Sequence, residues 1–120
     1  MRSYKTLVVW QRAHKLVLEI YAVTDAFPSS ERYGLTSQIR RAAVSIPANI
    51  AEGCSRGTDK DTANFFQISL GSAAELSYEL LLAHDLGFIE EVEYQTLASE
   101  VEQIGRMLNT LKQQFLANRK

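Results

Sequence analysis

Apolar residues recur along this chain at alternating spacings of three and four, which is the pattern of a helix that buries one side against its neighbours. One such series contains Val9, Ala13, Leu16, Ile20, Val23 and Phe27. Another contains Tyr94, Leu97, Val101, Ile104, Leu108, Leu111 and Phe115. Because no run of β-branched or aromatic residues is bounded by turn signals, the pattern favours an all-α fold.

Prolines and glycines fall mostly where helices should end. Pro28 ends the first predicted helix, because the residue before a proline disfavours the helical conformation, and Gly87 is suited to end the third. Thr58 and Asp61 resemble a capping box at the start of the third helix, and Thr36 is a candidate N-cap for the second. The four predicted helices span about residues 7–26, 35–53, 59–86 and 90–117.

Four helices joined by short loops favour an antiparallel up-down-up-down bundle, and a repeat of about 3.5 residues favours shallow crossing angles. The 120 residues fit a single domain, which we place at residues 1–120, and this length supports a core without disulfides or metals. Pro47 lies inside the second predicted helix, where it should cause a kink because it lacks an amide donor.

The composition argues against several classes of protein. The formal net charge is −1, so no strong overall field is available to attract nucleic acid or a membrane surface. Cys54 is the only cysteine, which rules out an intrachain disulfide and suits a reducing compartment. The apolar run from Leu7 to Trp10 is too short for a signal peptide or a membrane span. The expected location is therefore the cytoplasm.

The first and third predicted helices carry more apolar surface than a bundle core requires. Beside the core-facing series of the first helix lies a second apolar row, formed by Trp10, Val17 and Tyr21. The third helix is apolar almost all round, and Phe65 and Phe66 belong to this surface. Because one chain cannot easily bury all of it, we expect a homo-oligomer that covers parts of both helices. The alternative is a monomer with scattered exposed apolar residues.

Polar residues form an ordered row on the second predicted helix, next to its apolar side. The row contains Gln38, Arg41, Ser45, Asn49 and Glu52, which fall within about 80° of one another on a helical projection. Serine and asparagine are poor helix formers, so this row is unusual for a solvated face.

The third predicted helix offers counterparts to this row. Ser72, Glu75 and Glu79 share one side of it, and Gly71 would allow another backbone to approach closely. We expect Arg41 to form an ion pair with Glu75 or Glu79. Three interpretations stay open, namely a network that fixes helix register, an oligomer interface, and a ligand-binding site.

The second helix also carries a family resemblance. Residues 33–53 read YGLTSQIRRAAVSIPANIAEG, which resembles the signature of the 23S rRNA intervening-sequence protein family, also called four helix bundle protein. Shorter matches are Val9-Trp10-Gln11 with Ala13, Phe27-Pro28 with Glu31, and Gly71-Ser72 with Glu75. The resemblance covers essentially the whole chain.

The resemblance implies a left-handed four-helix bundle, and some members of the family assemble as homopentamers. Some are encoded inside intervening sequences of the large ribosomal RNA gene, and no biochemical activity is established for the family as a whole. A distantly similar bundle is the accessory protein of diversity-generating retroelements, which is pentameric and basic and binds a reverse transcriptase and nucleic acid. The present chain departs from that basic type, because its net charge is −1.

No combination of residues predicts an enzyme. A di-iron site in a helix bundle needs a glutamate three residues before a histidine on two helices, and neither His14 nor His84 has one. Cys54 has no histidine or lysine beside it, and no glycine-rich loop is followed by the lysine of a phosphate-binding loop. We therefore predict no catalytic residues, no metal ligands and no cofactor.

Arg40, Arg56 and Lys60 are the candidate nucleic-acid contacts, because an oligomer would repeat them around its axis. The simpler interpretation is that they are solubilising charges, since no aromatic residue interleaves with them in the sequence to stack bases. We interpret the chain as a non-enzymatic oligomeric scaffold or adaptor, a homopentamer by resemblance, that serves an unidentified protein partner. The alternative is an RNA- or DNA-binding accessory protein that uses the repeated basic surface.

Overall fold

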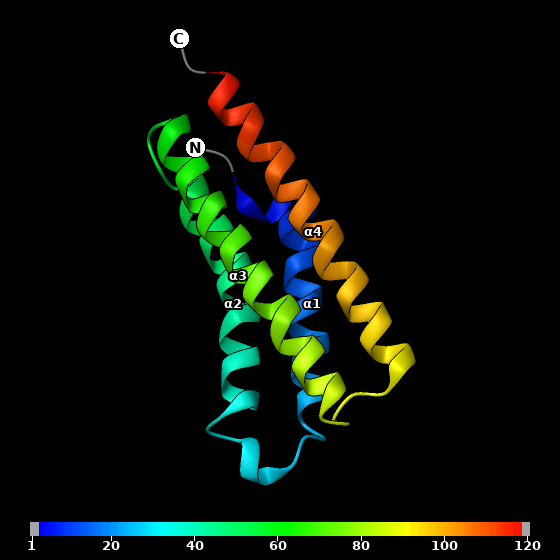
Figure 1. Ribbon diagram of the computed structural model, residues 1–120. Coiled ribbons are helices and arrows are strands. Elements are labelled where there is room, and N and C mark those ends of the chain that lie inside the picture. Colours follow the sequence, from blue (N-terminus) through cyan, green and yellow to red (C-terminus); the bar gives the residue numbers. More distant parts are fainter. Residues whose placement is uncertain (1–2, 119–120) are drawn as a thin grey trace.

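The computed structural model describes residues 3–118 and places four α-helices side by side, alternating in direction (Figure 1). The helices are α1 (Val8–Thr24), α2 (Leu35–Cys54), α3 (Asp59–Asp85) and α4 (Glu91–Ala117), with short 3-10 turns η1 (Tyr4–Thr6) and η2 (Ser29–Glu31). Each α-helix begins and ends within two residues of the bounds expected from the sequence. The all-α up-down bundle predicted from the apolar repeats is therefore the observed fold.

The two ends of α3 follow the local chemistry expected from the sequence. Thr58 Oγ1 accepts a hydrogen bond from the Asp61 amide at 3.1 Å, which is the expected N-cap of α3. Gly87 has φ of 83°, the left-handed conformation that ends α3 without steric cost. The N-cap expected at Thr36 is wrong, because α2 begins after Gly34 and Thr36 lies buried within its first turn.

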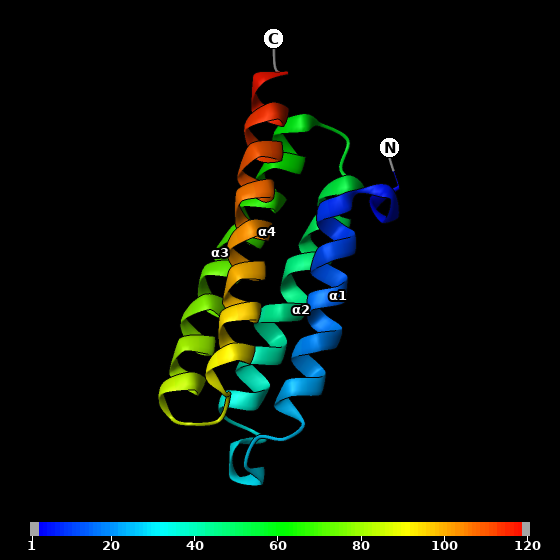
Figure 2. The same cartoon turned by 90° about the vertical axis from the view of Figure 1, so that its right-hand side faces the viewer.

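The helices pack in sequential order around the bundle. Helix α3 lies along α2 on one side and along α4 on the other, while α1 contacts α2 and, over a shorter stretch, α4. Among the residues that the structure describes, no Cα atom of α1 lies within 8 Å of one in α3, and Figure 2 shows the two helices on opposite sides of the bundle. The outward surfaces of α1 and α3 therefore face in different directions.

The buried core is formed by the apolar series seen in the sequence. From α1 it receives Val9, Ala13, Leu16 and Ile20, and Phe27 follows from the loop. From α4 it receives Leu97, Val101, Ile104, Leu108 and Phe115. Between them lie Ile39, Ile46 and Ile50 of α2, and Phe66, Leu76 and Leu80 of α3. The rings of Phe66 and Phe115 meet edge to face with centroids 5.5 Å apart, which joins α3 to α4.

A bidentate ion pair joins the outer edges of α1 and α4. Arg12 Nε donates to Glu100 Oε2 at 2.9 Å, and Arg12 Nη2 donates to Glu100 Oε1 at 2.6 Å. The same guanidinium also donates to Gln103 Oε1 at 2.7 Å. Because a planar guanidinium held by two parallel bonds permits little rotation, this pair fixes how α1 sits on α4.

Helices α2 and α3 approach most closely near Gly53. A Cβ atom at this position would lie 3.0 Å from Phe65 Cβ and 3.3 Å from Phe66 Cδ1. On the same side of α2, Thr62 Oγ1 donates to the Gly53 carbonyl at 2.9 Å, and Ser69 Oγ donates to the Ile46 carbonyl at 2.5 Å. Helix α2 continues through Pro47 to Cys54, and these hydroxyls bond to its main chain on either side of the proline.

We predict that Gly53→Ala lowers the free energy of unfolding by about 1–2 kcal/mol, because the crowding at its Cβ outweighs the gain in helix propensity. Gly105→Ala is the matched control, since a Cβ at Gly105, inside α4, meets no atom within 4 Å. It should raise the same free energy by up to about 1 kcal/mol. Urea denaturation of both variants measures the difference, and a stabilised Gly53→Ala would contradict the close packing.

Candidate functional site

Two members of the predicted polar row and one of its counterparts on α3 form a connected set of hydrogen bonds. Ser45 Oγ lies 2.7 Å from Ser72 Oγ, which links α2 to α3. Asn49 Nδ2 donates to Ser45 Oγ at 3.0 Å and to the Ser45 carbonyl at 2.8 Å. These half-buried side chains satisfy one another, so this part of the row fixes the register of the two helices.

The other members of the row do not join this set. Glu52 pairs instead with Arg56, one turn along the chain, at 2.8 Å. The expected ion pair of Arg41 with Glu75 or Glu79 is absent, because Arg41 is exposed and makes no ion pair among residues 3–118. Gln38, Arg41 and Glu75 line a hollow between α2 and α3 of about 440 Å³ instead.

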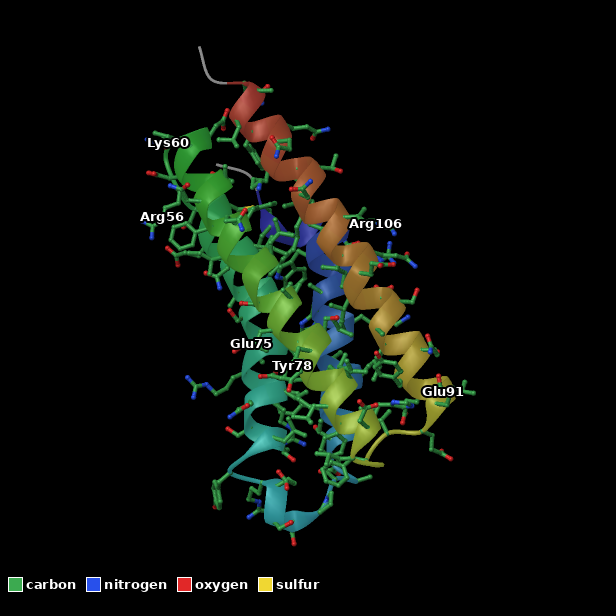
Figure 3. All side chains as sticks on the ribbon, in the orientation of Figure 1. Arg56, Lys60, Glu75, Tyr78, Glu91 and Arg106 are labelled. Atoms are coloured by element: carbon green, nitrogen blue, oxygen red, sulfur yellow. The ribbon has the colours of Figure 1, made fainter. Side chains whose placement is uncertain are left out.

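Glu79 lies in the wall of this hollow and is the most unusual acid in the chain. The residue is only 5% exposed, and its Oε1 has no hydrogen-bond partner among the described residues. Burial, and then the negative charge of Glu75, raise the pKa of Glu79 to about 7. Figure 3 shows Glu75 and Tyr78 along the middle of α3, and Glu75 is one of the residues that line the hollow. The hollow therefore holds a carboxyl group that changes charge near neutral pH.

Two residues of the α2–α3 contact were missed from the sequence. Ser69 and Thr62 are buried and donate their hydroxyl hydrogens to main-chain carbonyls of α2. Their spacing from Ser72, three and ten residues, places all three on one side of α3, and that spacing was the available signal. These three hydroxyl side chains therefore mark the contact of α3 with α2.

The five candidate interface residues divide between the core and the surface. Phe66 is wrong as an interface residue, because it is fully buried inside the single chain. Trp10 and Val17 are half-buried, and the Trp10 ring packs between Tyr4 and His14, with centroids 5.0 Å from each. Tyr21 stays exposed, and Phe65 is half-buried.

Several of the large apolar side chains that stay exposed lie on α1 and α3, while others lie on α2, on α4 and in the loops. On α1 these include Leu18, which is 59% exposed, and Tyr21. On α3 they include Ile68, which is 49% exposed, and Tyr78. A Cβ at Gly71, between Ile68 and Tyr78, would meet no atom within 4 Å, so the close approach expected there does not occur within the chain.

The three candidate nucleic-acid contacts do not form one patch. Arg40 donates to Thr24 Oγ1 at 2.8 Å and to the Tyr21 carbonyl at 3.3 Å, and its guanidinium lies over the Tyr21 ring. Arg56 and Lys60 lie together at the end of the bundle where α2 joins α3 (Figure 3). Arg40 and Arg56 are about 20 Å apart along the helix axis, at about 1.5 Å per residue.

Arg40 and Arg56 each have an aromatic neighbour in the fold that is not adjacent to them in the sequence. The Arg40 guanidinium lies 4.4 Å from the Tyr21 ring centroid, and the Arg56 guanidinium lies 4.5 Å from that of Phe65. The expectation that no aromatic residue accompanies these cations is therefore wrong. Both rings come from neighbouring helices, so the pairing arises only in the folded chain.

The described residues also bear on metal binding, on histidine chemistry and on membrane insertion. Within residues 3–118, no group of three or more His, Cys, Asp or Glu side chains is placed to hold a metal ion. His84 bridges the end of α3 and the start of α4, with Nε2 2.7 Å from Glu91 Oε1, and its pKa is raised by its hydrogen bonds to Asp85 and Glu91. None of the helices in this part of the chain is long and apolar enough to cross a membrane.

Comparisons with known proteins agree with this fold. A model of the 23S rRNA-intervening sequence protein family matches residues 5–110. Among solved structures, a protein of unknown function from the S23 ribosomal protein family of Bacteroides thetaiotaomicron is similar, with a TM-score of 0.82 and 24% sequence identity. That match covers 88% of this chain and 98% of the other, and at this identity it shows the fold alone. No curated protein matches the chain.

We predict that Glu79→Gln removes a pH dependence of stability. The folded-state pKa of about 7 lies above the ordinary value of 4.5, so the wild-type free energy of unfolding falls as pH rises from 4.5 through 7. The neutral amide of the variant does not ionise, so its stability does not fall in this way. The free energy of unfolding of the variant should exceed that of the wild type by about 3 kcal/mol at about pH 8 and equal it at about pH 4.

The measurement is chemical denaturation of the wild type and Glu79→Gln across this pH range. Glu75→Gln is the matched control, because it removes the neighbouring charge and keeps Glu79. It should move the fall in stability to lower pH without abolishing it. Parallel pH profiles for wild type and Glu79→Gln would show that Glu79 does not titrate as described.

Proposed function

The chain belongs to the 23S rRNA-intervening sequence protein family, and from this premise we propose that it is a non-enzymatic homo-oligomeric scaffold. Each subunit would contact two neighbours, one through α1 and one through α3. A protein partner would bind the outside of the assembly. Five subunits is the number that the family resemblance implies.

The observation that carries this proposal is the position of the exposed apolar side chains. Leu18 and Tyr21 lie on α1 and Ile68 and Tyr78 lie on α3, two helices that occupy opposite corners of the bundle. A two-fold dimer formed through α1 leaves the exposed apolar side chains of α3 in water, and a dimer formed through α3 leaves those of α1 in water. A head-to-tail contact covers both sides in every subunit and closes into a ring when the rotation permits.

The surface around Ile68 is also suited to a close helix contact. Gly71 on α3 leaves open space above the backbone, and Ala48 and Val44 on the neighbouring α2 are exposed and small. Small side chains let another helix approach closely, so that dispersion contacts become numerous. This supports α3, with the adjoining part of α2, as one half of the subunit contact.

We predict a solution mass several times 13.5 kDa for the wild type, measured by light scattering after size exclusion at low and high salt. Because apolar contacts are not screened by ions, the mass should persist at high salt. A wild type that is a monomer at every concentration tested would end the scaffold proposal.

Leu18→Ser and Ile68→Ser should each shift the assembly toward the monomer, because each places a polar group in one half of the contact. Both side chains are about half exposed in the single chain, so the subunit should still fold, which circular dichroism checks. Val92→Ser is the matched control, since Val92 is 80% exposed on α4. An equal loss of mass in all three variants would contradict the assignment of α1 and α3.

Nucleic-acid binding is the second candidate function, and the pair of Arg56 with the Phe65 ring favours it. A cation held over an aromatic ring beside the exposed Lys60 offers both a phosphate contact and a stacking surface. Ring symmetry would repeat this pair in every subunit. Arg56 also pairs with Glu52, so a phosphate would compete with that carboxylate. Arg40 is not part of this basic pair, because it lies in the first half of α2, bound to Thr24 and Tyr21.

We predict that a double variant, Arg56→Gln with Lys60→Gln, weakens any retardation of a single-stranded RNA probe in a gel at low salt. Arg106→Gln with Lys112→Gln is the matched control, because it removes two charges from α4. Binding should weaken with salt in proportion to the phosphates neutralised. Failure of the wild type to retard RNA or DNA at low salt would remove this second function.

A further inference from the structure

A cleft lies where the end of α1, the loop after it and the start of α2 meet, and only Tyr21 and Val44 of its lining also belong to the surfaces of the scaffold proposal. Its volume is about 800 Å³, which is within the range of small-ligand sites. Its walls include Tyr21 and Asp25 from the end of α1, and Tyr33 from the loop. Figure 1 shows this loop, with its short turn η2, at the end of the bundle away from both termini.

Three arginines line this cleft, although the whole chain has a net charge of −1. Arg40 is held in place by its hydrogen bonds to α1. Arg32 and Arg41 make no ion pair and no side-chain hydrogen bond among the described residues, so their guanidinium donors are available to a ligand. Asp25 is the only acid in the lining, and its nearest cation is Arg40 at 3.9 Å. The lining therefore carries an excess of two positive charges.

The first turn of α2 adds neutral donors to the same cleft. Thr36 and Ser37 both line it, and the N-cap Gly34 has no side chain to accept from the amides of this turn. The Leu35 amide donates to Glu31 Oε1 at 3.3 Å, which leaves the following amides of the turn for a ligand. Thr36 is only 7% exposed, and its Oγ1 has no hydrogen-bond partner within residues 3–118. Buried hydroxyl groups in folded proteins are nearly always paired. An anion in the cleft would give this turn the acceptor that it lacks.

We propose that this cleft binds the phosphate group of a small phosphorylated molecule, which Arg32 and Arg41 contact together with the N-terminal turn of α2. The helix dipole, the amide donors of the first turn and two unpaired guanidinium groups all favour a doubly charged oxyanion over a neutral ligand. Tyr33, which is almost fully exposed at the edge of the cleft, offers a flat surface for the rest of the ligand.

A small molecule fits this cleft better than a nucleic-acid strand does. The arginines of this cleft lie at one end of the bundle and Arg56 and Lys60 lie at the other, so these two groups do not form one continuous basic track (Figure 3). A strand would need such a track to hold successive phosphates. The cleft instead gathers its donors around one point.

The test is isothermal titration calorimetry of the full chain at low ionic strength, with pyrophosphate and adenosine monophosphate as probes. Saturable binding of either probe supports the phosphate site, and tighter binding of the nucleotide adds a contact to its ring. Arg32→Gln and Arg41→Gln should each weaken binding about tenfold, the value expected for one charge-assisted hydrogen bond. Arg106→Gln, which removes an exposed arginine from α4, should leave the affinity unchanged.

Thr36→Val separates a binding role from a structural one. It keeps the shape of the side chain and removes the unpaired hydroxyl, so the free protein should be as stable as the wild type or more stable. Binding of pyrophosphate should weaken several-fold. No saturable binding of either probe, or an equal loss in Arg106→Gln, overturns the proposal. Light scattering on the same variants keeps this result separate from the scaffold proposal, because none of these substitutions alters the exposed apolar residues of α1 or α3.

Discussion

Hydroxyl groups of α3 bond to main-chain carbonyls of α2 at Ile46 and Gly53, and these bonds hold the two helices too close for a Cβ at Gly53. The rest of the bundle is built on this pair. Helix α4 packs against α3 through Phe66 and Phe115, and α1 packs against α2. Because α1 and α3 then occupy opposite corners, the pair also decides which apolar surfaces are left facing water.

The apolar repeats predicted the fold because burial depends on which side of a helix a residue occupies, and a helix fixes that side within its own sequence. Val9, Leu16, Ile104 and Leu108 lie in the core for this reason. The partners of polar residues depend on how far one helix is shifted along another, which no single helix encodes. The predicted ion pair of Arg41 with Glu75 or Glu79 is therefore wrong. The contact between Ser45 and Ser72 was predicted only as part of a larger polar row.

The small net charge of the chain hides a marked separation of charge. Arg32, Arg40 and Arg41 line the cleft between α1 and α2, whereas Glu19, Glu90, Glu91 and Glu93 line a groove between α1 and α4. The two surfaces share α1, so oppositely charged faces flank one helix. Composition alone argues against a strong overall field, but it says nothing about fields within a few ångströms of a surface, where a ligand is recognised.

The buried carboxyl group of Glu79 lies close to the exposed apolar surface of α3. The hollow that contains it is lined by Arg41 and Glu75, and it lies beside the apolar surface of α3 that includes Tyr78. A neighbouring subunit on that surface would remove more water from the hollow, which disfavours the charged carboxylate still further. Proton uptake by Glu79 and coverage of α3 would then favour each other, because any contact that raises a pKa is itself strengthened when the proton binds. The unpaired carboxyl is thus costly for the isolated chain, but it need not be costly for an assembled one.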